Sequence, residues 1–431
     1  MRGRPARALA LAALVGGGLG GGAAAQTAPP ETAGPAWCEL PVVEASVPPP
    51  PAGAALRAES VCDASGPGAR FEVTYEGFSA AAQAAFQAAV DTWSCLLRSD
   101  QPVRVEARWT GLNPTTLGSA GPRLVRNFEG APARDTWYPA ALADHLAGRD
   151  LGPDVPDIEA SFNRDFPAWH LGPGPPPEGA FDFYTVVLHE LAHGLGFIGG
   201  LAVEEGRGVV GRDEARGPFA YDLHAEDAAG TALLDTRAYP APSGRLADAL
   251  TSAVRFDGQA VRRVRGGPVA LYAPARWVPG GSYSHLDEDA FEPGTRDGLM
   301  SPFVSRGETV DRPGPVTCAV LADVGWTLAG ACLDAVGPAP PGGGGVEVVR
   351  AGPNPFRTRT ALRVESAEPG LARAVLLDAR GRRVADLGAT AVLPDRPFEV
   401  VVDAGGLATG VYLVDVRVGA GRRVVPLTVV R

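Results

Sequence analysis

The sequence predicts an α+β domain followed by a smaller all-β sandwich. Three observations support this architecture: strands with alternating apolar residues flank a helix near the start of the core, a buried helix covers residues 183–196, and short strands follow a linker rich in Pro and Gly. The chain has 431 residues, of which 45% are hydrophobic, which is enough for more than one core. We expect the first domain to have two lobes, with the buried helix on the floor of the cleft between them.

Net charge and the N-terminal segment limit the class of protein. The formal net charge is −10 and the basic residues are scattered, so the sequence shows no cluster of positive charge that would bind nucleic acid or an anionic membrane. In residues 1–25, three arginines precede an apolar run that ends in small residues, as in a secretory signal peptide. No later run is long enough to span a membrane. The sequence therefore predicts an exported protein with no nucleic-acid partner and no stable membrane span after signal removal.

The first half of the core alternates strand and helix patterns. The elements we expect, in chain order, are a strand over residues 71–76, a helix over 80–97 capped by Ser79, strands over 103–109 and 123–128, a helix over 140–147 and a strand over 157–162. The first two strands can run parallel, since a helix connects them. In the later interval before residue 283, we expect a hairpin of residues 219–224 with 231–234 and a helix from Ser243 to Leu250.

The central helix carries a pattern of metal-binding side chains. His189 and His193 are four residues apart, so on a helix both rings lie on one face and can bind a single metal ion. Neutral imidazoles suit Zn2+, and Glu190, next to the first histidine, can take a proton from a metal-bound water. The alternative is a core helix with two incidental histidines. We favour a zinc hydrolase in which Glu190 is the general base, because the chain has only six histidines.

Two histidines cannot complete a tetrahedral zinc site. A third protein ligand must come from elsewhere in the chain, with water in the fourth position. We favour His285, because it precedes the only methionine besides the initiator, Met300, in a Leu-Met-Ser-Pro turn. The candidates that stay open are Glu204, Glu205 and Asp287, and the histidines with less in their favour are His145, His170 and His224.

These motifs carry a family resemblance. The pattern His-Glu-x-x-His-x-x-Gly-Phe over residues 189–197, with the later His285 and the Leu-Met-x-Pro of residues 299–302, resembles the metzincin metallopeptidases. The usual third histidine of that family falls three residues after the glycine, where this chain has Gly199. The leishmanolysin group is similar in having an inserted segment, then Ser-His, then a Leu-Met-x-Pro turn. The resemblance implies that His285 is the third ligand and that Met300 lies in the turn beneath the site.

We therefore expect a secreted zinc endopeptidase that hydrolyses peptide bonds through a metal-bound water activated by Glu190, with a protein or peptide as substrate. His189, His193 and His285 would hold the Zn2+. Two other classes stay open: a zinc hydrolase of a non-peptide amide or ester, and a non-catalytic adhesion or matrix protein with a structural metal site. A structural site has no need of the Glu190 carboxylate, and its presence favours catalysis.

The segment before the core contains Cys38, which could form a disulfide or bind the metal ion. Residues 26–60 are rich in Pro and Ala and show no sustained period, so we expect an extended leader before the metallopeptidase domain of residues 61–335. An exported chain can form disulfides, and its five cysteines allow two bridges with one cysteine left over. A sharper hypothesis is that the thiolate of Cys38 caps the metal ion in a latent enzyme. The pairs we consider are Cys38 with Cys62 and Cys318 with Cys332.

A linker rich in Pro and Gly over residues 336–345 marks a domain boundary. Residues 346–431 then alternate short strand patterns with turns, which is typical of a small β-sandwich. The strands we expect cover residues 361–364, 373–377, 398–402, 410–418 and 423–430.

Three short motifs of this tail carry a second resemblance. They are Pro-Asn-Pro-Phe at residues 353–356, Asp-Ala-Arg-Gly-Arg at 378–382 and Leu-Ala-Thr-Gly-Val-Tyr at 407–412. They look like the C-terminal sorting domain of cargo for the type IX secretion route. The resemblance implies that the type IX secretion machinery carries the protein from the periplasm to the medium or the cell surface. The alternative is a sandwich that binds carbohydrate or protein.

Overall fold

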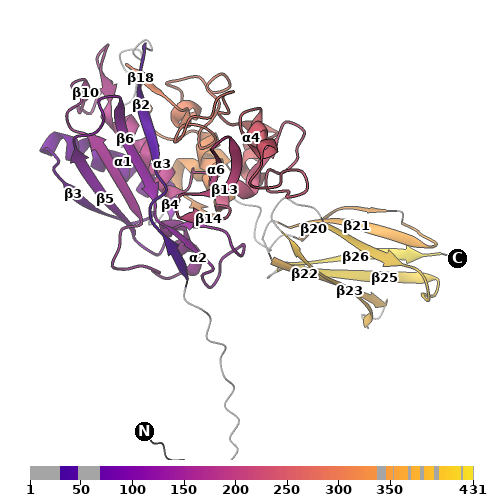
Figure 1. Cartoon of the computed structure of the whole chain (residues 1–431). Coiled ribbons are helices and arrows are strands. Elements are labelled where there is room, and N and C mark those ends of the chain that lie inside the picture. Colours follow the sequence, from indigo (N-terminus) through magenta and orange to yellow (C-terminus); the bar gives the residue numbers. More distant parts are fainter. Residues whose placement is uncertain are drawn as a thin grey trace, which may run out of the picture.

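The computed structural model shows a larger body of mixed α and β structure and a smaller β-sandwich, here called the tail (Figure 1). This composition is compatible with the α+β class, while the division of the body into two lobes stays a prediction. The predicted signal peptide and residues 337–345 of the predicted linker lie outside the described residues. The described residues are 30–46, 68–336, 346–352, 354–366, 370–378, 383–392, 398–418 and 421–430.

A six-stranded sheet forms the centre of the body. Its strands are β2 (Cys38–Ser46), β3 (Phe71–Glu76), β5 (Val103–Thr110), β6 (Thr116–Pro122), β9 (Ile158–Asn163) and β18 (Val304–Arg306). They lie in the order β18-β2-β6-β9-β5-β3. β3, β5 and β9 are parallel, β6 is antiparallel to both β9 and β2, and β18 is parallel to β2. The strands expected over residues 71–76, 103–109 and 157–162 are confirmed to within one residue.

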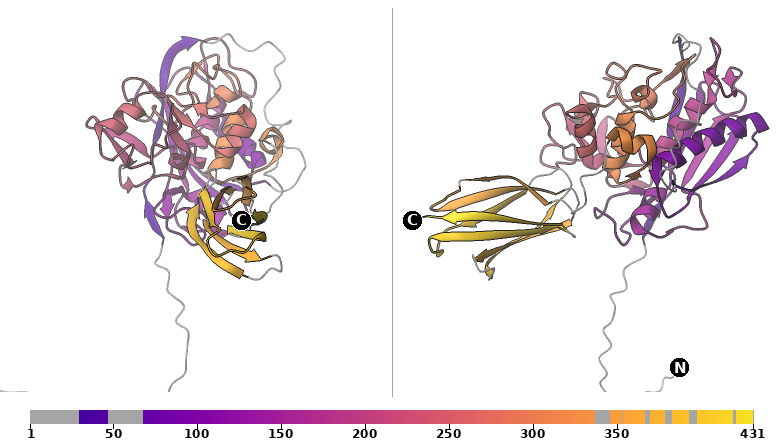
Figure 2. Two further views of the ribbon diagram at one scale, coloured as in Figure 1. Left: turned by 90° about the vertical axis from the view of Figure 1, so that its right-hand side faces the viewer. Right: turned by 180° about the vertical axis from the view of Figure 1, so that it is seen from behind.

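Residues 30–46 of the leader belong to the folded body, which the sequence pattern does not predict. Besides β2, it supplies β1 (Glu31–Ala33), which pairs with β7 (Leu124–Arg126) beside β8 (Tyr138–Pro139). β7 is also shorter than the strand expected over residues 123–128. β6 and β18 offer backbone N–H and C=O groups that need partners, and this tertiary context outweighs the weak local pattern of β2. Figure 2 shows the leader, in indigo, extending along the body.

The helices of the body place one buried helix against the sheet. Ser79 caps α1 (Ala80–Leu96), since its Oγ accepts a hydrogen bond from the Ala82 N–H at 3.2 Å. Every residue of α3 (Phe183–Leu195) is buried, against β6, β9 and α1. The Trp93 Nε1–H of α1 donates to the Leu188 carbonyl of α3 at 3.1 Å. The remaining α-helices are α2 (Ala140–Ala147), α4 (Gly244–Leu250), α5 (Gln259–Arg265), α6 (Pro315–Val324) and α7 (Gly330–Val336).

A long insertion follows α3. It begins with a hairpin of β12 (Leu201–Glu204) and β13 (Arg207–Arg212), followed by β14 (Ala215–Arg216). The hairpin expected over residues 219–224 and 231–234 is wrong: Ala220–His224 is a 3-10 helix, η1, because the Asp222 carboxylate accepts from the Phe219 N–H at 2.7 Å. The Ser243 cap of α4 is confirmed, with Oγ accepting from the Leu246 N–H. The remaining short elements of the body are β4 (Leu97–Arg98), β10 (Trp169–His170), β11 (Phe181–Asp182), β15 (Ala225–Asp227), β16 (Val254–Phe256), β17 (Val269–Ala270), η2 (Asp297–Met300) and β19 (Thr327–Leu328).

One predicted disulfide is present and one is wrong. Cys318 of α6 and Cys332 of α7 are bonded, which ties the last two helices of the body together. Cys38 is buried and free, so it is not paired with Cys62. Cys95 is disulfide-bonded, and Cys62 lies outside the described residues. The free thiol therefore belongs to the first residue of β2.

The tail is a sandwich of two antiparallel sheets. One contains β20 (Val346–Gly352), β21 (Arg359–Ser366) and β24 (Phe398–Asp403), and the other β23 (Arg383–Val392), β22 (Gly370–Asp378), β25 (Gly410–Val418) and β26 (Gly421–Val429). All five expected strands are present, and β20 and β23 are additional. The apolar side chains of the two sheets form a core of their own, separate from that of the body.

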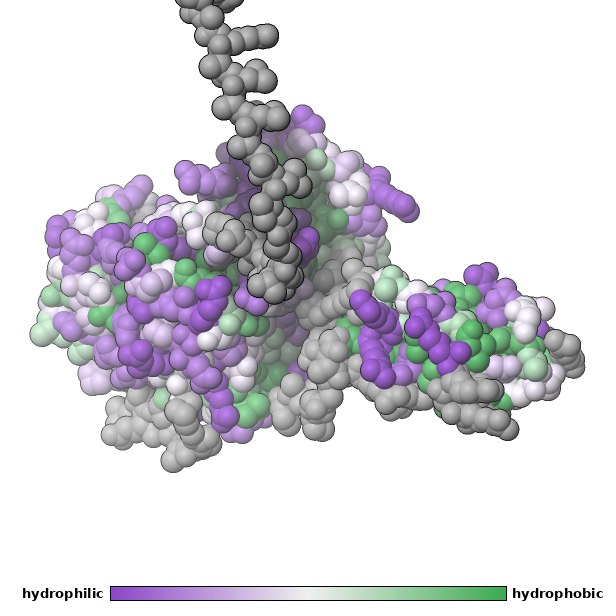
Figure 3. Space-filling view, turned by 90° about the horizontal axis from the view of Figure 1, so that it is seen from below, coloured by the Kyte–Doolittle hydropathy of each residue, from purple (hydrophilic) through white to green (hydrophobic). Residues whose placement is uncertain are grey.

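The surface mixes residues of different hydropathy. Among the described residues, no helix combines the length and the apolar character that crossing a membrane requires. Hydrophilic residues are interspersed with hydrophobic ones on the face seen in Figure 3, on the body as well as on the tail.

Candidate metal centre

Three histidines converge in the middle of the body. His189 and His193 lie on one face of α3, and His285 comes from the loop after β17. The Nε2 atoms of His189 and His193 are 3.0 Å apart, and each lies 3.2 Å from Nε2 of His285. All three side chains have 0% exposure. The structure thus brings together the three residues that the sequence analysis assigned to the metal.

The other ring nitrogens fix the tautomer of each histidine. Nδ1 lies 2.7 Å from a backbone carbonyl oxygen in every case, that of Leu299 for His189, Phe197 for His193 and Gly281 for His285. A carbonyl oxygen only accepts hydrogen bonds, so each Nδ1 carries the proton and each Nε2 keeps a bare lone pair.

Three bare lone pairs cannot hydrogen-bond to one another, but they can share a cation. A tetrahedral Zn2+ with Zn–N distances of about 2.0–2.1 Å requires its nitrogen ligands to be about 3.3 Å apart, close to the separations of these Nε2 atoms. The donor set therefore fits a metal ion. Neutral imidazole is the state in which histidine binds metals.

Burial keeps these rings neutral. It lowers the pKa of His193 to about 4, and it lowers the pKa of His189 and of His285 well below the ordinary value, with the neighbouring His193 as the next cause. A charged imidazole would have to give up its hydration in this apolar surround, which is why the neutral form prevails.

Local backbone turns aim the three rings. Gly196, with φ of +123°, ends α3 and turns the Phe197 carbonyl back toward His193. The η2 turn positions the other two histidines. The Leu299 carbonyl accepts a hydrogen bond from Nδ1–H of His189, and the Met300 carbonyl accepts one from the Leu286 N–H, the residue after His285, at 2.8 Å. Met300 is fully buried there, as expected for a residue beneath the site.

The geometry also explains why no ligand stands at position 199. A Cβ built on Gly199 would lie 2.0 Å from the ring of Tyr283, so no side chain fits there. The Gly199 N–H donates to the Ser284 Oγ at 3.0 Å. The loop of Tyr283 and Ser284 packs on the end of the metal helix and delivers the next residue, His285, to the site.

Glu190 is buried beside the histidines, and the nearby Ala120 N–H opposes the rise that burial causes in its pKa. Both of its carboxylate oxygens lack a hydrogen-bond partner among the described residues, and the side chain has 0% exposure. Burial, with a further contribution from Cys38, raises the pKa of Glu190 well above the ordinary value. A buried carboxyl group without donors costs free energy, so its presence needs a functional reason.

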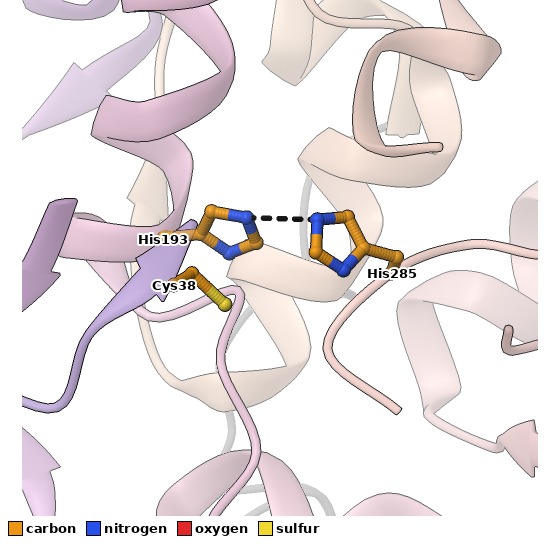
Figure 4. A group of neighbouring side chains, drawn as sticks. All are labelled: Cys38, His193 and His285. Atoms are coloured by element: carbon orange, nitrogen blue, oxygen red, sulfur yellow. Dashed lines mark hydrogen bonds between the residues drawn. The ribbon is translucent and has the colours of Figure 1, made fainter. Parts of the chain in front are cut away.

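Cys38 approaches the histidines from the leader. Its ligand atom and those of His193 and His285 lie within 4.8 Å of one another, and Figure 4 shows the thiol next to the two facing rings. The thiol donates to the Gly280 carbonyl at 3.2 Å. Burial raises the pKa of Cys38, while the positive charge of Arg212 opposes that rise. The leader therefore places a potential fourth ligand at the same centre.

The other candidate ligands lie elsewhere. Glu204 is exposed and its carboxylate pairs with Arg216 at 2.9 Å. Glu205 occupies the turn of the β12–β13 hairpin, and the Asp287 carboxylate accepts from the Asp289 N–H. The remaining histidines contact other groups: His145 stacks on Trp326, His170 lies 2.9 Å from the Gly174 carbonyl and His224 stacks on Phe256.

Two residues that support the site were missed in the sequence. Asp222 is fully buried and accepts from the Gly200 N–H at 2.9 Å and from the Tyr283 hydroxyl at 2.8 Å, so it joins the end of α3 to the loop of His285. Burial raises its pKa to about 6. Arg212 lies on β13, with its charge near Cys38 and His193. An aspartate within an apolar run was the only available signal for the first, and nothing marked the second.

No model of a protein family matches the chain, and no curated protein is similar to it. A functional assignment therefore depends on the geometry of the site and on the motifs that the sequence carries.

Proposed function

We propose that the chain is a zinc-dependent endopeptidase that folds in a latent form. The observation that carries the proposal is the convergence of three neutral histidines, through bare Nε2 atoms, beside the fully buried carboxyl group of Glu190. His189, His193 and His285 would hold Zn2+. When bound, Zn2+ acts as a Lewis acid and lowers the pKa of its water ligand to about 7.

The role of Glu190 follows from its place and its raised pKa. Its carboxylate takes a proton from the attacking water as the oxygen of that water bonds to the peptide carbonyl carbon. It then gives the proton to the leaving amine nitrogen as the C–N bond breaks. A carboxyl group whose pKa is raised by burial is a better proton acceptor than an ordinary one, which suits this double task.

The leader supports a peptide as substrate. β2 is an extended segment that pairs with β6, with Cys38 opposite Ala120 and Leu40 opposite Gly118. The first residue of β2 lies at the histidine cluster, so an extended peptide backbone fits along β6 up to the metal position. Strand addition to a sheet edge gives affinity through backbone hydrogen bonds. A small non-peptide amide would make no use of this edge.

Latency follows from what covers the centre. Cys38 and Glu190 have 0% exposure, as have the three histidines, so substrate has no access in this state. Thiolate is a good ligand of Zn2+, and Cys38 would occupy the position that water needs. Activation therefore requires the leader to withdraw, which removes the thiol and frees the edge of β6.

We also propose that the tail is the sorting domain for type IX secretion and that the mature enzyme works outside the cell. The sandwich with its own aliphatic core supports a module that folds independently. The three motifs of the tail named above give the specific link to that route.

The test compares a chain that carries a specific protease site between residues 46 and 68 with the same chain bearing Glu190→Gln. After cutting and blocking of the thiol with a mercurial, the parent is expected to cleave unfolded casein and peptides of a quenched-fluorescence library. Glu190→Gln is expected to retain zinc and to lose about 10²- to 10⁴-fold in kcat. Glu204→Gln, at an exposed carboxylate, serves as the control. Equal cleavage by the Glu190→Gln chain and its parent would contradict the proposed enzymatic function.

A structural metal site in an adhesion or matrix protein is the second candidate, because Cys38 with three histidines would make four protein ligands. Closed sites of four protein ligands are typical of structural zinc. In that case the cut chain would lose metal and cleave nothing. A panel of small amides and esters, run beside the peptides, tests the remaining alternative of a non-peptide hydrolase.

A further inference from the structure

Arg212 holds unpartnered donors inside the body. It is the last residue of β13, and its guanidinium carbon lies 6.0 Å from the centre of the Phe219 ring. Its Nε and Nη2 atoms are buried and have no hydrogen-bond partner among the described residues. Buried N–H donors of a cation without an acceptor are costly, and natural structures retain few of them.

These donors lie on the side of the metal centre that the leader covers. Phe219, beneath the guanidinium, packs in one hydrophobic cluster with Cys38 and Ile198. The positive charge of Arg212 also lowers the pKa of the Cys38 thiol, which agrees with its place beside that cluster. Arg212 therefore borders the place where the Cys38 thiol stands in the latent state.

We propose that Arg212 stabilises the negative charge that develops on the peptide carbonyl oxygen during hydrolysis, once Cys38 has withdrawn. This role rests on the proposed peptidase function. Nε–H and Nη2–H point in parallel from one edge of the guanidinium plane, which matches one or two oxygens on a single carbon. Preformed donors in a dry site are the strongest means of stabilising such a charge.

The step balances without a proton from Arg212. Water oxygen bonds to the carbonyl carbon, Glu190 takes the proton and the carbonyl electron pair moves onto the carbonyl oxygen. Arg212 donates hydrogen bonds to that oxygen and transfers no proton, because a guanidinium keeps its protons in proteins. The electron pair then re-forms the C=O bond, the C–N bond breaks and the amine receives the proton from Glu190.

A rival role makes a different prediction. If Arg212 serves only to hold the Cys38 thiolate in the latent state, then Arg212→Ala should raise the activity of the uncut chain and leave the cut chain unchanged. If it binds the developing oxyanion, the loss appears in the cut chain and in kcat.

The experiment uses the cut full-length chain with Arg212→Ala and Arg212→Lys, and Arg207→Ala as the control. Arg207 lies on the same strand but is exposed, with its guanidinium donating to the Pro242 carbonyl at 2.6 Å. For Arg212→Ala we expect kcat to fall about 10²- to 10³-fold with little change in KM, as for loss of other oxyanion donors. Zinc content should stay at the parental level, and Arg212→Lys should recover part of the activity.

A second readout separates binding of the charge from general damage. A phosphinic pseudo-peptide, built on the best-cleaved library peptide, has phosphorus in place of the tetrahedral carbon, with one negative charge shared by two oxygens. Calorimetry should show it binding to Arg212→Ala more weakly by about the same factor as the loss in kcat. An unchanged kcat, or a loss of zinc in both Arg212 variants that matches the loss of activity, overturns the proposal. A cut parent chain that cleaves nothing overturns the proposed function, and this role with it.

Discussion

The body and the tail bury different kinds of side chain. In the body, His189, Glu190, His193 and His285 all have 0% exposure at the middle of the molecule. In the tail, the core cluster is almost wholly aliphatic, and its buried Asp415 is paired with Arg417. The tail can therefore gain its stability from apolar burial, at about 25 cal/mol per Å2. The body has to stabilise a polar centre as well.

The buried polar side chains of the body need a bound cation, and the apolar core of the tail does not. Without a cation, three lone pairs face one another at 3.0–3.2 Å, and both oxygens of the Glu190 carboxyl group are buried without a hydrogen bond of normal geometry to any described residue. Both features are unfavourable in an apolar surround. A bound metal ion removes the first, and binding free energy of this kind adds to the stability of the fold. The body should thus depend on metal and the tail should not.

The largest effect is expected from removing a ligand. His285→Ala should weaken zinc binding by orders of magnitude, because one of three protein ligands is lost, whereas a residue that only supports a ligand costs about 10- to 100-fold. The measurement is zinc content and affinity of the folded protein. His224→Ala, Glu204→Ala and Asp287→Ala serve as controls, since these side chains lie away from the cluster. If His285→Ala binds zinc like the parent while a control variant loses it, the assignment of the third ligand is wrong.

A smaller effect is expected from removing the metal from the intact chain. With free zinc at 1,000 times its Kd, binding stabilises the folded body by about 4.1 kcal/mol. For a domain of this size that corresponds to a rise in Tm of roughly 10 °C. Calorimetry with and without a chelator should show the transition of the body falling by about this amount.

The tail provides the internal reference of that measurement, because its transition should stay in place when the chelator is added. A common shift of both transitions would contradict the separation of the two cores. No shift in either would contradict a metal centre in the body.

Whether a structural feature can be predicted from the sequence depends on how far apart in the chain the interacting residues lie. His189, Glu190 and His193 are set by helix periodicity, which operates over four residues, so their arrangement could be read directly. The caps at Ser79 and Ser243 are equally local, and both were predicted correctly. His285 lies 92 residues after His193 and was reached through the turn motif of the resemblance, not through periodicity.

What was missed depends on contacts between distant segments. β2 pairs with β6 across roughly 80 residues of chain, and its Pro/Ala-rich surroundings give no strand pattern. Arg212 matters because its charge lies near Cys38, more than 170 residues earlier in the chain, and Asp222 because it joins two ends of the insertion. Local patterns carry no information on such pairings. The sequence therefore predicted the burial of the metal centre by the leader only through the hypothesis that Cys38 caps the metal.

The smallest effect on catalysis is expected from deleting the tail. Removal of residues 346–431 should leave the zinc content and the peptidase activity of the cut chain at the parental level, because the core of the body contains no side chain of the tail.

In a host that has the type IX route, the truncated protein should accumulate in the periplasm while the full chain reaches the medium or the cell surface. Cell fractionation with activity assays on each fraction measures both effects. Replacing only Tyr412 of the third tail motif by Ala provides a gentler companion variant, since its partly exposed side chain packs against the tail core and donates one hydrogen bond, to the Ala408 carbonyl at 3.0 Å. Normal export of the truncated chain would refute the sorting role, and a folded but inactive body would show that the two domains depend on each other after all.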